Sequence, residues 1–171
     1  MKMDAGLDTG PILSQCAIQL NPQDTAGFIS ETLSKIGAEL LIKTIPGYLS
    51  GEILPQPQPE QGATYAPMLK KEDGRLDFSE PAEILTRRVY ACNPWPGAFM
   101  DFKSGRLKIH RAHAVGVTSL EKVPGTRINH SGEPGVITSD GLLVLDEVQV
   151  SGKKPIAGRS FLTGGHDWEG S

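Results

Sequence analysis

Residues 3–13 read Met-Asp-Ala-Gly-Leu-Asp-Thr-Gly-Pro-Ile-Leu, and this stretch decides which fold the chain can adopt. It places Asp4 and Asp8 among glycines on a predicted loop. The loop leads into an apolar segment, Ile12 to Leu20, which we expect to form a strand. Carboxylates on a loop beside a strand end are typical of the sites of open α/β sheets. The stretch therefore predicts part of an α/β domain that performs chemistry.

An amphipathic helix is predicted after this strand. Asp24 or Thr25 can accept hydrogen bonds from its first-turn N–H groups. Apolar residues then recur at helical spacing, at Ile29, Leu33, Ile36, Leu40 and Leu41. Pro46-Gly47 is expected to end or kink the helix, and Gly51 to close the unit. One strand and one helix cannot bury their own apolar stripe, so residues 1–51 need a sheet to lie on.

A proline-rich stretch follows at residues 52–62. Prolines at positions 55, 57 and 59 disfavour a helix and favour an extended polyproline path. At ~3.1 Å per residue this stretch could span roughly 30 Å. We interpret it as a connector between domains; the alternative is a surface loop held against its own domain.

The second half of the chain predicts one short helix and then strands. Ser79 is a suitable N-cap for a helix that runs to about Cys92, with Ile84, Leu85, Val89 and possibly Tyr90 on its apolar face. Five short strands are expected at Ala98 to Phe102, Leu107 to Val115, Gly125 to Ile128, Gly135 to Thr138 and Leu142 to Val150. In the second of these, Leu107, Ile109 and Arg111 alternate with Lys108 and His110. Such a series suits a small closed or partly open barrel.

Composition sets broad limits. The 171 residues suit one ordinary domain or two small ones, and 38% hydrophobic with 22% charged residues is typical of a soluble globular protein. No apolar run approaches the ~20 residues that cross a bilayer, so no membrane association is expected. Cys16 and Cys92 match no disulfide or metal-ligand spacing, which favours a reducing, cytoplasmic setting.

Charge is distributed unevenly over the two halves. The net charge is −3, with −4 on residues 1–68 and +1 on residues 69–171. This balance is not the broad basic field of a typical nucleic-acid binder. Any binding of a polyanion must therefore depend on local clusters of Lys and Arg.

Taken together, the motifs resemble the C-terminal portion of methionyl-tRNA formyltransferases. The matching pieces cover nearly the whole chain in the family's order: MDAGLDTGPIL (3–13), the helix that ends GAELL, TYAPMLKKEDGRLDF (64–78), NPWPGAF (93–99), DGLLVLDEVQ (140–149) and GKKPI (152–156). The resemblance implies transfer of a formyl group from 10-formyltetrahydrofolate to the amino group of methionyl-initiator tRNA, by a cytoplasmic enzyme that is monomeric in its full-length form and needs no metal.

The resemblance also implies a fold of class α/β plus β. Residues 1–51 would be the last strand and helix of a Rossmann-like formyltransferase domain. Residues 52–78 would be an extended linker, and residues 79–171 a C-terminal OB-like β-barrel that binds tRNA.

Asp8 resembles the Asp of the family's catalytic Asn, His and Asp. Amine attack on a formyl carbon builds an oxyanion and a cationic nitrogen, and a carboxylate can stabilise a protonated His or relay the amine proton. The alternative is that Asp8 and Thr9 merely form a tight turn with Gly10. The family's Asn and His match no residue of this sequence, because His110, His113, His130 and His166 all fall in or after the barrel. We therefore expect a fragment that is inactive alone.

The binding residues follow from the same resemblance. Met3, Asp4, Gly6 and Leu7 match a loop that lines the pterin end of the folate pocket. The alternative is that these residues form an ordinary flexible loop. Candidates for tRNA phosphates are Lys70, Lys71, Arg75, Lys103, Arg106, Lys108, Arg111, Lys153 and Lys154. Each could equally be a solvated surface charge. Trp95 is expected to pack between the helix and the barrel; the alternative is a platform on which a base stacks.

Two other functions stay open at this point. One is a related folate-dependent formyltransferase or hydrolase that acts on a nucleotide sugar or free folate. The other is a stand-alone barrel module that binds RNA without catalysis. Among these, the GKKPI motif and the connector sequence favour the tRNA enzyme.

Overall fold

The computed structural model describes residues 1–103, 105–116, 123–164 and 167–170. It contains two compact units, one formed by Met1–Asn21 with Phe28–Met68 and the other by Pro22–Gly27 with Leu69–Ser171. The step from one unit to the other at Met68 lies inside the connector expected at residues 52–78. The bounds of the three expected segments stay a prediction.

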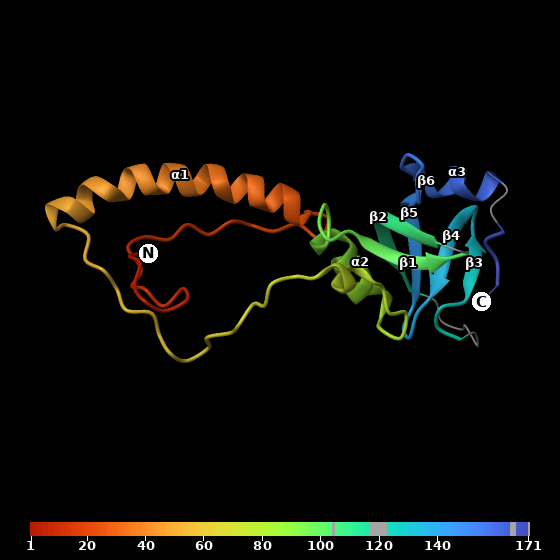
Figure 1. Ribbon diagram of the computed structural model, residues 1–171, viewed down its shortest axis with the longest axis horizontal. Coiled ribbons are helices and arrows are strands. Elements are labelled where there is room, and N and C mark those ends of the chain that lie inside the picture. The colour runs from red at the N-terminus through yellow and green to blue at the C-terminus, as the bar shows by residue number, and fades with distance from the viewer. Residues whose placement is uncertain (104, 117–122, 165–166, 171) are drawn as a thin grey trace. The chain divides into compact units, whose positions relative to one another are not determined.

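Helix α1 (Ala26–Ser50) is longer than the sequence pattern indicated. It continues through Pro46 and Gly47 and stops at Ser50, before Gly51 with its left-handed φ of 81°. Figure 1 shows it as one continuous, gently curved helix. A proline removes one backbone hydrogen bond, so the turns on both sides can still hold the helix together.

The strand expected at Ile12 to Leu20 does not form. Ile12 makes one antiparallel bridge with Gln56, through backbone hydrogen bonds of 2.7 and 2.8 Å, and the segment is otherwise extended without a strand partner among the described residues. A strand requires a neighbour along its length to pair its N–H and C=O groups. The segment instead touches α1, where Ser14 Oγ lies 2.7 Å from Oγ1 of the buried Thr44.

The second unit is built on an antiparallel sheet (Figure 1). Its strands are β1 (Ala98–Phe102), β2 (Gly105–Val115), β3 (Arg127–His130), β4 (Glu133–Ile137), β5 (Leu142–Val150) and β6 (Ile156–Ala157). The order is β1-β2-β5-β4-β3, and β6 pairs with β5. The expected bounds of β1 and β5 are confirmed, whereas the short β6 was not expected. The turn expected at Ser104-Gly105 includes position 104, which lies outside the described residues.

Helix α2 (Ala82–Ala91) covers the inner side of the sheet. Leu85 and Val89 are fully buried in one cluster with Leu107 and Leu145 of the sheet. Helix α3 (Gly158–Thr163) adds Phe161 to the same core. The rings of Phe161, Phe102 and Trp168 pack with centroids 5.6 to 5.8 Å apart.

Ser79 is not the N-cap of α2, which corrects the sequence-based expectation. The helix begins after Pro81, and no side chain caps it. The backbone N–H and the hydroxyl of Ser79 both donate to Oδ1 of Asp77, at 3.0 and 2.7 Å. An Asx turn therefore satisfies Ser79 two residues before the helix starts.

Candidate functional site

The loop that carries Asp4 and Asp8 closes on itself within the first unit. The N–H of Lys2 donates to the carbonyl of Pro11 at 2.8 Å, and a Cβ at Gly10 would collide with the Lys2 carbonyl. The side-chain amide of Gln58 donates to the carbonyls of both Asp8 and Gly10, at 2.7 Å each. The connector thus helps to fix the backbone of this loop.

The two carboxylates of the loop have different surroundings. Oδ1 of Asp4 accepts hydrogen bonds from the Gly6 N–H at 3.0 Å and from the Thr9 hydroxyl at 2.6 Å. Asp8 is exposed and adopts a left-handed φ of 54°, and its carboxylate accepts no hydrogen bond from the residues that the structure describes. Asp4 therefore stabilises the loop, whereas Asp8 presents a carboxylate that can exchange a proton or stabilise a cation.

The other residues expected near a folate are also exposed. Met3 is 86% exposed and Leu7 77% exposed, and Gly6 is exposed as well. Apolar side chains in this position can cover a planar ring. The role of these residues in folate binding stays a prediction.

The sheet brings together basic residues that are far apart in the sequence. Lys108 on β2 is paired in register with Gln149 on β5. The amide Nε2 of Gln149 donates to the carbonyl of Lys153 at 2.7 Å, and Lys153 lies in the turn that follows β5. Lys108 and the turn that carries the exposed Lys153-Lys154 pair are therefore neighbours in the second unit, and together with Arg106 of β2 we call these residues the basic face.

Arg111 reaches solvent because β2 is irregular. The register with β5 shifts on both sides of Arg111, so Ala112 enters the core and Arg111 is exposed opposite Glu147. Strict alternation with Leu107 and Ile109 would have directed Arg111 inward.

Other predicted cations lie along β1 and the segment before it. Arg75 forms an ion pair with Asp101, and the guanidinium of Arg106 lies 4.2 Å from the centroid of the Phe99 ring. Lys103 at the β1–β2 turn lies 3.6 Å from Asp167. Lys70 and Lys71 are exposed at the start of the 3₁₀ helix η1 (Lys71–Gly74), and the Lys70 N–H donates to Oδ2 of Asp73.

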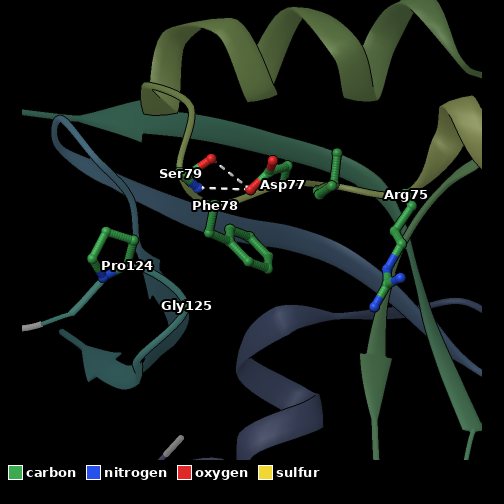
Figure 2. Close-up of a pocket in the computed structure, with 7 residues that line it drawn as sticks. Arg75, Asp77, Phe78, Ser79, Pro124 and Gly125 are labelled. Atoms are coloured by element: carbon green, nitrogen blue, oxygen red, sulfur yellow. Dashed lines mark hydrogen bonds between the residues drawn. The ribbon is translucent and has the colours of Figure 1, made fainter.

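A groove that the sequence did not indicate lies beside this segment (Figure 2). It has a volume of about 450 Å³ and is lined by Arg75, Leu76, Asp77, Phe78, Ser79, Pro124 and Gly125. In Figure 2 the Phe78 ring and the Asp77 carboxylate lie on opposite sides of their extended segment. The hydrogen bonds from Ser79 lower the pKa of Asp77 below its ordinary value, so this wall carries a negative charge at neutral pH.

Trp95 does not pack as expected. Its side chain is 53% exposed between Pro94 and Pro96, whereas Phe99, Phe102, Tyr90 and Trp168 are buried. Among the described residues, no group of three or more His, Cys, Asp or Glu could hold a metal ion. No helix in the described part of the chain is long and apolar enough to span a bilayer.

Residues 68–166 match the family described as "Formyl transferase, C-terminal domain". The chain belongs to this family. The resemblance noted in the sequence is thereby confirmed, since the curated relatives carry the name methionyl-tRNA formyltransferase.

Two relatives illustrate the match. The methionyl-tRNA formyltransferase of Chloroflexus aurantiacus is 43% identical over 168 residues, which are 97% of this chain and 54% of the relative. The methionyl-tRNA formyltransferase of Myxococcus xanthus is 43% identical over 166 residues, which are 96% of this chain and 52% of the relative. The chain thus spans about half the length of the curated relatives it matches.

Solved structures share the fold at low sequence identity. HypX from Aquifex aeolicus in complex with tetrahydrofolic acid has a TM-score of 0.62 at 17% identity, covering 93% of this chain and 28% of HypX. The N-formyltransferase from Helicobacter canadensis, in complex with folinic acid and dTDP-3-aminofucose, has a TM-score of 0.63 at 15% identity, covering 84% of this chain and 52% of its own. The antiparallel sheet with its helices therefore matches the corresponding region of formyltransferases.

Proposed function

We propose that this chain is part of an enzyme that transfers a formyl group from 10-formyltetrahydrofolate to the amino group of methionyl-initiator tRNA. The observation that carries the proposal is the 43% identity over 97% of the chain to a methionyl-tRNA formyltransferase. A formyltransferase for nucleotide sugars is the second candidate. The N-formyltransferase from Helicobacter canadensis in complex with dTDP-3-aminofucose shares the fold, but at 15% identity it supports this candidate less.

The two units correspond to two parts of such an enzyme. We infer that residues 1–51 belong to a Rossmann-like catalytic domain, residues 52–78 to an extended linker and residues 79–171 to an OB-like barrel. The apolar residues that α1 exposes, such as Leu41 and Ile42, support the first assignment, because a crossover helix packs on a sheet. The five-stranded path β1-β2-β5-β4-β3 supports the last.

The loop around Asp8 provides the proposed chemistry. The methionyl nitrogen attacks the formyl carbon, the C–N10 bond of the folate breaks, and the amine loses one proton while N10 gains one. Asp8 would hold or relay this proton through its exposed carboxylate, and Met3, Gly6 and Leu7 would contact the folate ring. Asp4 serves differently, because its Oδ1 is already engaged by Gly6 and Thr9.

The second unit provides the proposed contacts to the initiator tRNA. Phosphates of the tRNA would bind Lys108, Arg111, Lys153 and Lys154 on or beside the basic face, and Lys70, Lys71 and Arg75 nearer the connector. The exposure of these side chains supports this role. Because Arg75 is already paired with Asp101, its contribution should be smaller than that of Lys108.

A chimera tests the proposal. The matching half of the Chloroflexus aurantiacus enzyme is replaced by this chain, and formylation of methionyl-tRNA is measured with 10-formyltetrahydrofolate. Asp8→Asn in the chimera should lower kcat by about 10²–10⁴-fold, the usual contribution of a proton-transfer group. Asp4→Asn is the matched control: an amide oxygen can still accept both loop hydrogen bonds, so the rate should stay within about tenfold.

Two results would contradict the proposal. A chimera that formylates nucleotide-linked amino sugars but not methionyl-tRNA would favour the second candidate. Full activity of Asp8→Asn would show that Asp8 takes no part in the reaction, whatever the substrate.

A further inference from the structure

A small hollow lies between β2 and the turn that precedes β1. Its volume is about 80 Å³, and its walls include Asn93, Pro94, Gly97, Lys108 and His110. This volume suits a phosphate group. The hollow opens beside Lys108, the central cation of the basic face, so it is a candidate site for one unit of a nucleic-acid backbone.

Hydrogen bonds fix the walls of the hollow. The side-chain amide of Asn93 donates to the carbonyl of His110 at 3.2 Å, and the Gly97 N–H donates to the carbonyl of Cys92 at 2.8 Å. Gly97 has a φ of 82°, a conformation that glycine adopts without steric cost. The turn and the strand are therefore held at a fixed separation, as a preorganised binding site requires.

The same network determines the tautomer of His110. Because Nε2 of Gln149 donates to the Lys153 carbonyl, Oε1 is the end of that amide that faces His110, and it lies 3.0 Å from the imidazole Nε2. An amide oxygen only accepts, so Nε2 of His110 carries the hydrogen. In the neutral ring Nδ1 is then a hydrogen-bond acceptor.

We propose that one sugar–phosphate unit of RNA binds here, with its phosphate in the hollow and paired to Lys108, and with its 2′-hydroxyl outside the hollow donating a hydrogen bond to Nδ1 of His110. A cation beside an acceptor matches this unit, because phosphate oxygens accept while the 2′-hydroxyl donates. Lys153 and Lys154 provide further positive charge for neighbouring phosphates. The inference rests on the tRNA partner proposed above and specifies where the backbone of that RNA binds.

The first test is the salt dependence of binding. An unacylated initiator tRNA transcript is bound to the 171-residue chain between 50 and 200 mM KCl. Lys108→Ala should weaken binding and reduce the log–log salt slope by about 0.7–0.9, the value for one lost phosphate contact. Arg159→Ala is the matched control, because Arg159 is an exposed cation on α3 that is paired with Glu133. A slope for Lys108→Ala equal to that of Arg159→Ala would overturn the proposal.

The second test concerns the sugar. The chain should prefer the RNA transcript several-fold over the same sequence made with 2′-deoxyribose, and His110→Leu should abolish this preference while leaving the salt slope unchanged. If His110→Leu still prefers the RNA transcript over the 2′-deoxyribose version, His110 does not contact the 2′-hydroxyl.

Two further outcomes separate the possible failures. If the unmodified chain does not bind the transcript at all, the proposed tRNA partner fails together with this inference. If inorganic phosphate at constant ionic strength binds the unmodified chain but not Lys108→Ala, and leaves the affinity for the transcript unchanged, the hollow is a site for free phosphate, and the sugar–phosphate assignment is wrong.

Discussion

Helices α1 and α2 both carry an apolar stripe, but they bury very different parts of it. Thr44 is the buried residue of α1, all of whose positions the structure describes, and Ile42 remains 72% exposed. Helix α2 is less than half as long and fully buries Leu85 and Val89. The comparison teaches that an amphipathic pattern predicts a helix, whereas the presence of a sheet decides whether its stripe becomes part of a core.

The energetic consequence is a difference in self-sufficiency between the two units. Full burial of a Leu or Val side chain contributes about 1.5–3 kcal/mol, and the core of the second unit contains many such residues. The first unit is held mainly by hydrogen bonds that are exposed or only partly buried, such as those from Gln58 to the loop, and each contributes about 1 kcal/mol. We therefore expect the second unit to fold without the first, but not the reverse.

The largest expected effect comes from separating the units. Residues 69–171 alone should unfold in one cooperative transition with an enthalpy on the order of 70 kcal/mol, as is typical of about 100 residues. Residues 1–68 alone should show no cooperative transition, because α1 lacks a packed partner. Thermal unfolding followed by circular dichroism measures both. A sharp transition for residues 1–68 would contradict the expectation that only the second unit folds by itself.

A pair of neighbouring residues on α2 tests the role of burial directly. Leu85→Ala should lower the free energy of unfolding by about 2–5 kcal/mol, because it leaves a cavity under the sheet. Ile84→Ala is the matched control on the same helix, and since Ile84 is 41% exposed it should cost less than about 1.5 kcal/mol. Urea unfolding of residues 69–171 measures both values. Equal losses would show that burial in the sheet is not what distinguishes α2.

Parts of the second unit could be predicted well from the sequence. β5 begins with a run of four apolar residues, Leu142–Leu145, and continues to Val150, and turn residues lie on both sides of it, so both of its ends could be predicted. The phase of β2 could not be predicted beyond Ile109, because the irregularity at Arg111 depends on pairing with β5. The two residues of β6 are too few to give a period.

The first unit shows the opposite limit. The segment from Ile12 to Leu20 has the composition of a strand, but sequence composition does not supply a neighbouring strand to pair with it. The candidate site shows the same limit. Lys108 and Lys153 can each be predicted as a phosphate ligand from the sequence, but only the β2–β5 register and the Gln149 side chain make them neighbours. His110 cannot be identified as a binding residue from the sequence, because its partner Gln149 lies on another strand.

The two cysteines provide a chemical comparison of the units. Cys16 is exposed in the first unit, whereas Cys92 is buried in the second, and burial raises the pKa of the Cys92 thiol. The thiolate is the reactive form, and the fold must open before a reagent reaches Cys92. A disulfide reagent at pH 8 should therefore modify Cys16 more than about tenfold faster than Cys92. Cys16→Ser should remove the fast phase and leave the slow one, and urea should make the two rates equal.

The smallest expected effect concerns the segment that leads into α2. The hydrogen bonds from Ser79 hold the pKa of Asp77 below its ordinary 3.8, with a minor contribution from Arg88. A depressed pKa in the folded state stabilises the fold above the pKa of the unfolded chain, and this stabilisation is lost as the pH falls through the folded value. The urea midpoint of the unmodified chain should therefore exceed that of Asp77→Asn at pH 5, and the gap should shrink towards pH 2.

Ser79→Ala is the matched variant for this pH effect, because it removes the hydroxyl donor and keeps the carboxylate. The difference in urea midpoint between Ser79→Ala and the unmodified chain should be smaller than that for Asp77→Asn, since the Ser79 N–H still donates to Asp77. If the difference in urea midpoint for Asp77→Asn stays constant from pH 5 to pH 2, the carboxylate charge does not stabilise the segment before α2. Packing of Leu85 and Val89 would then hold α2 on the sheet without help from the turn, which would make the contrast with α1 depend on apolar burial alone.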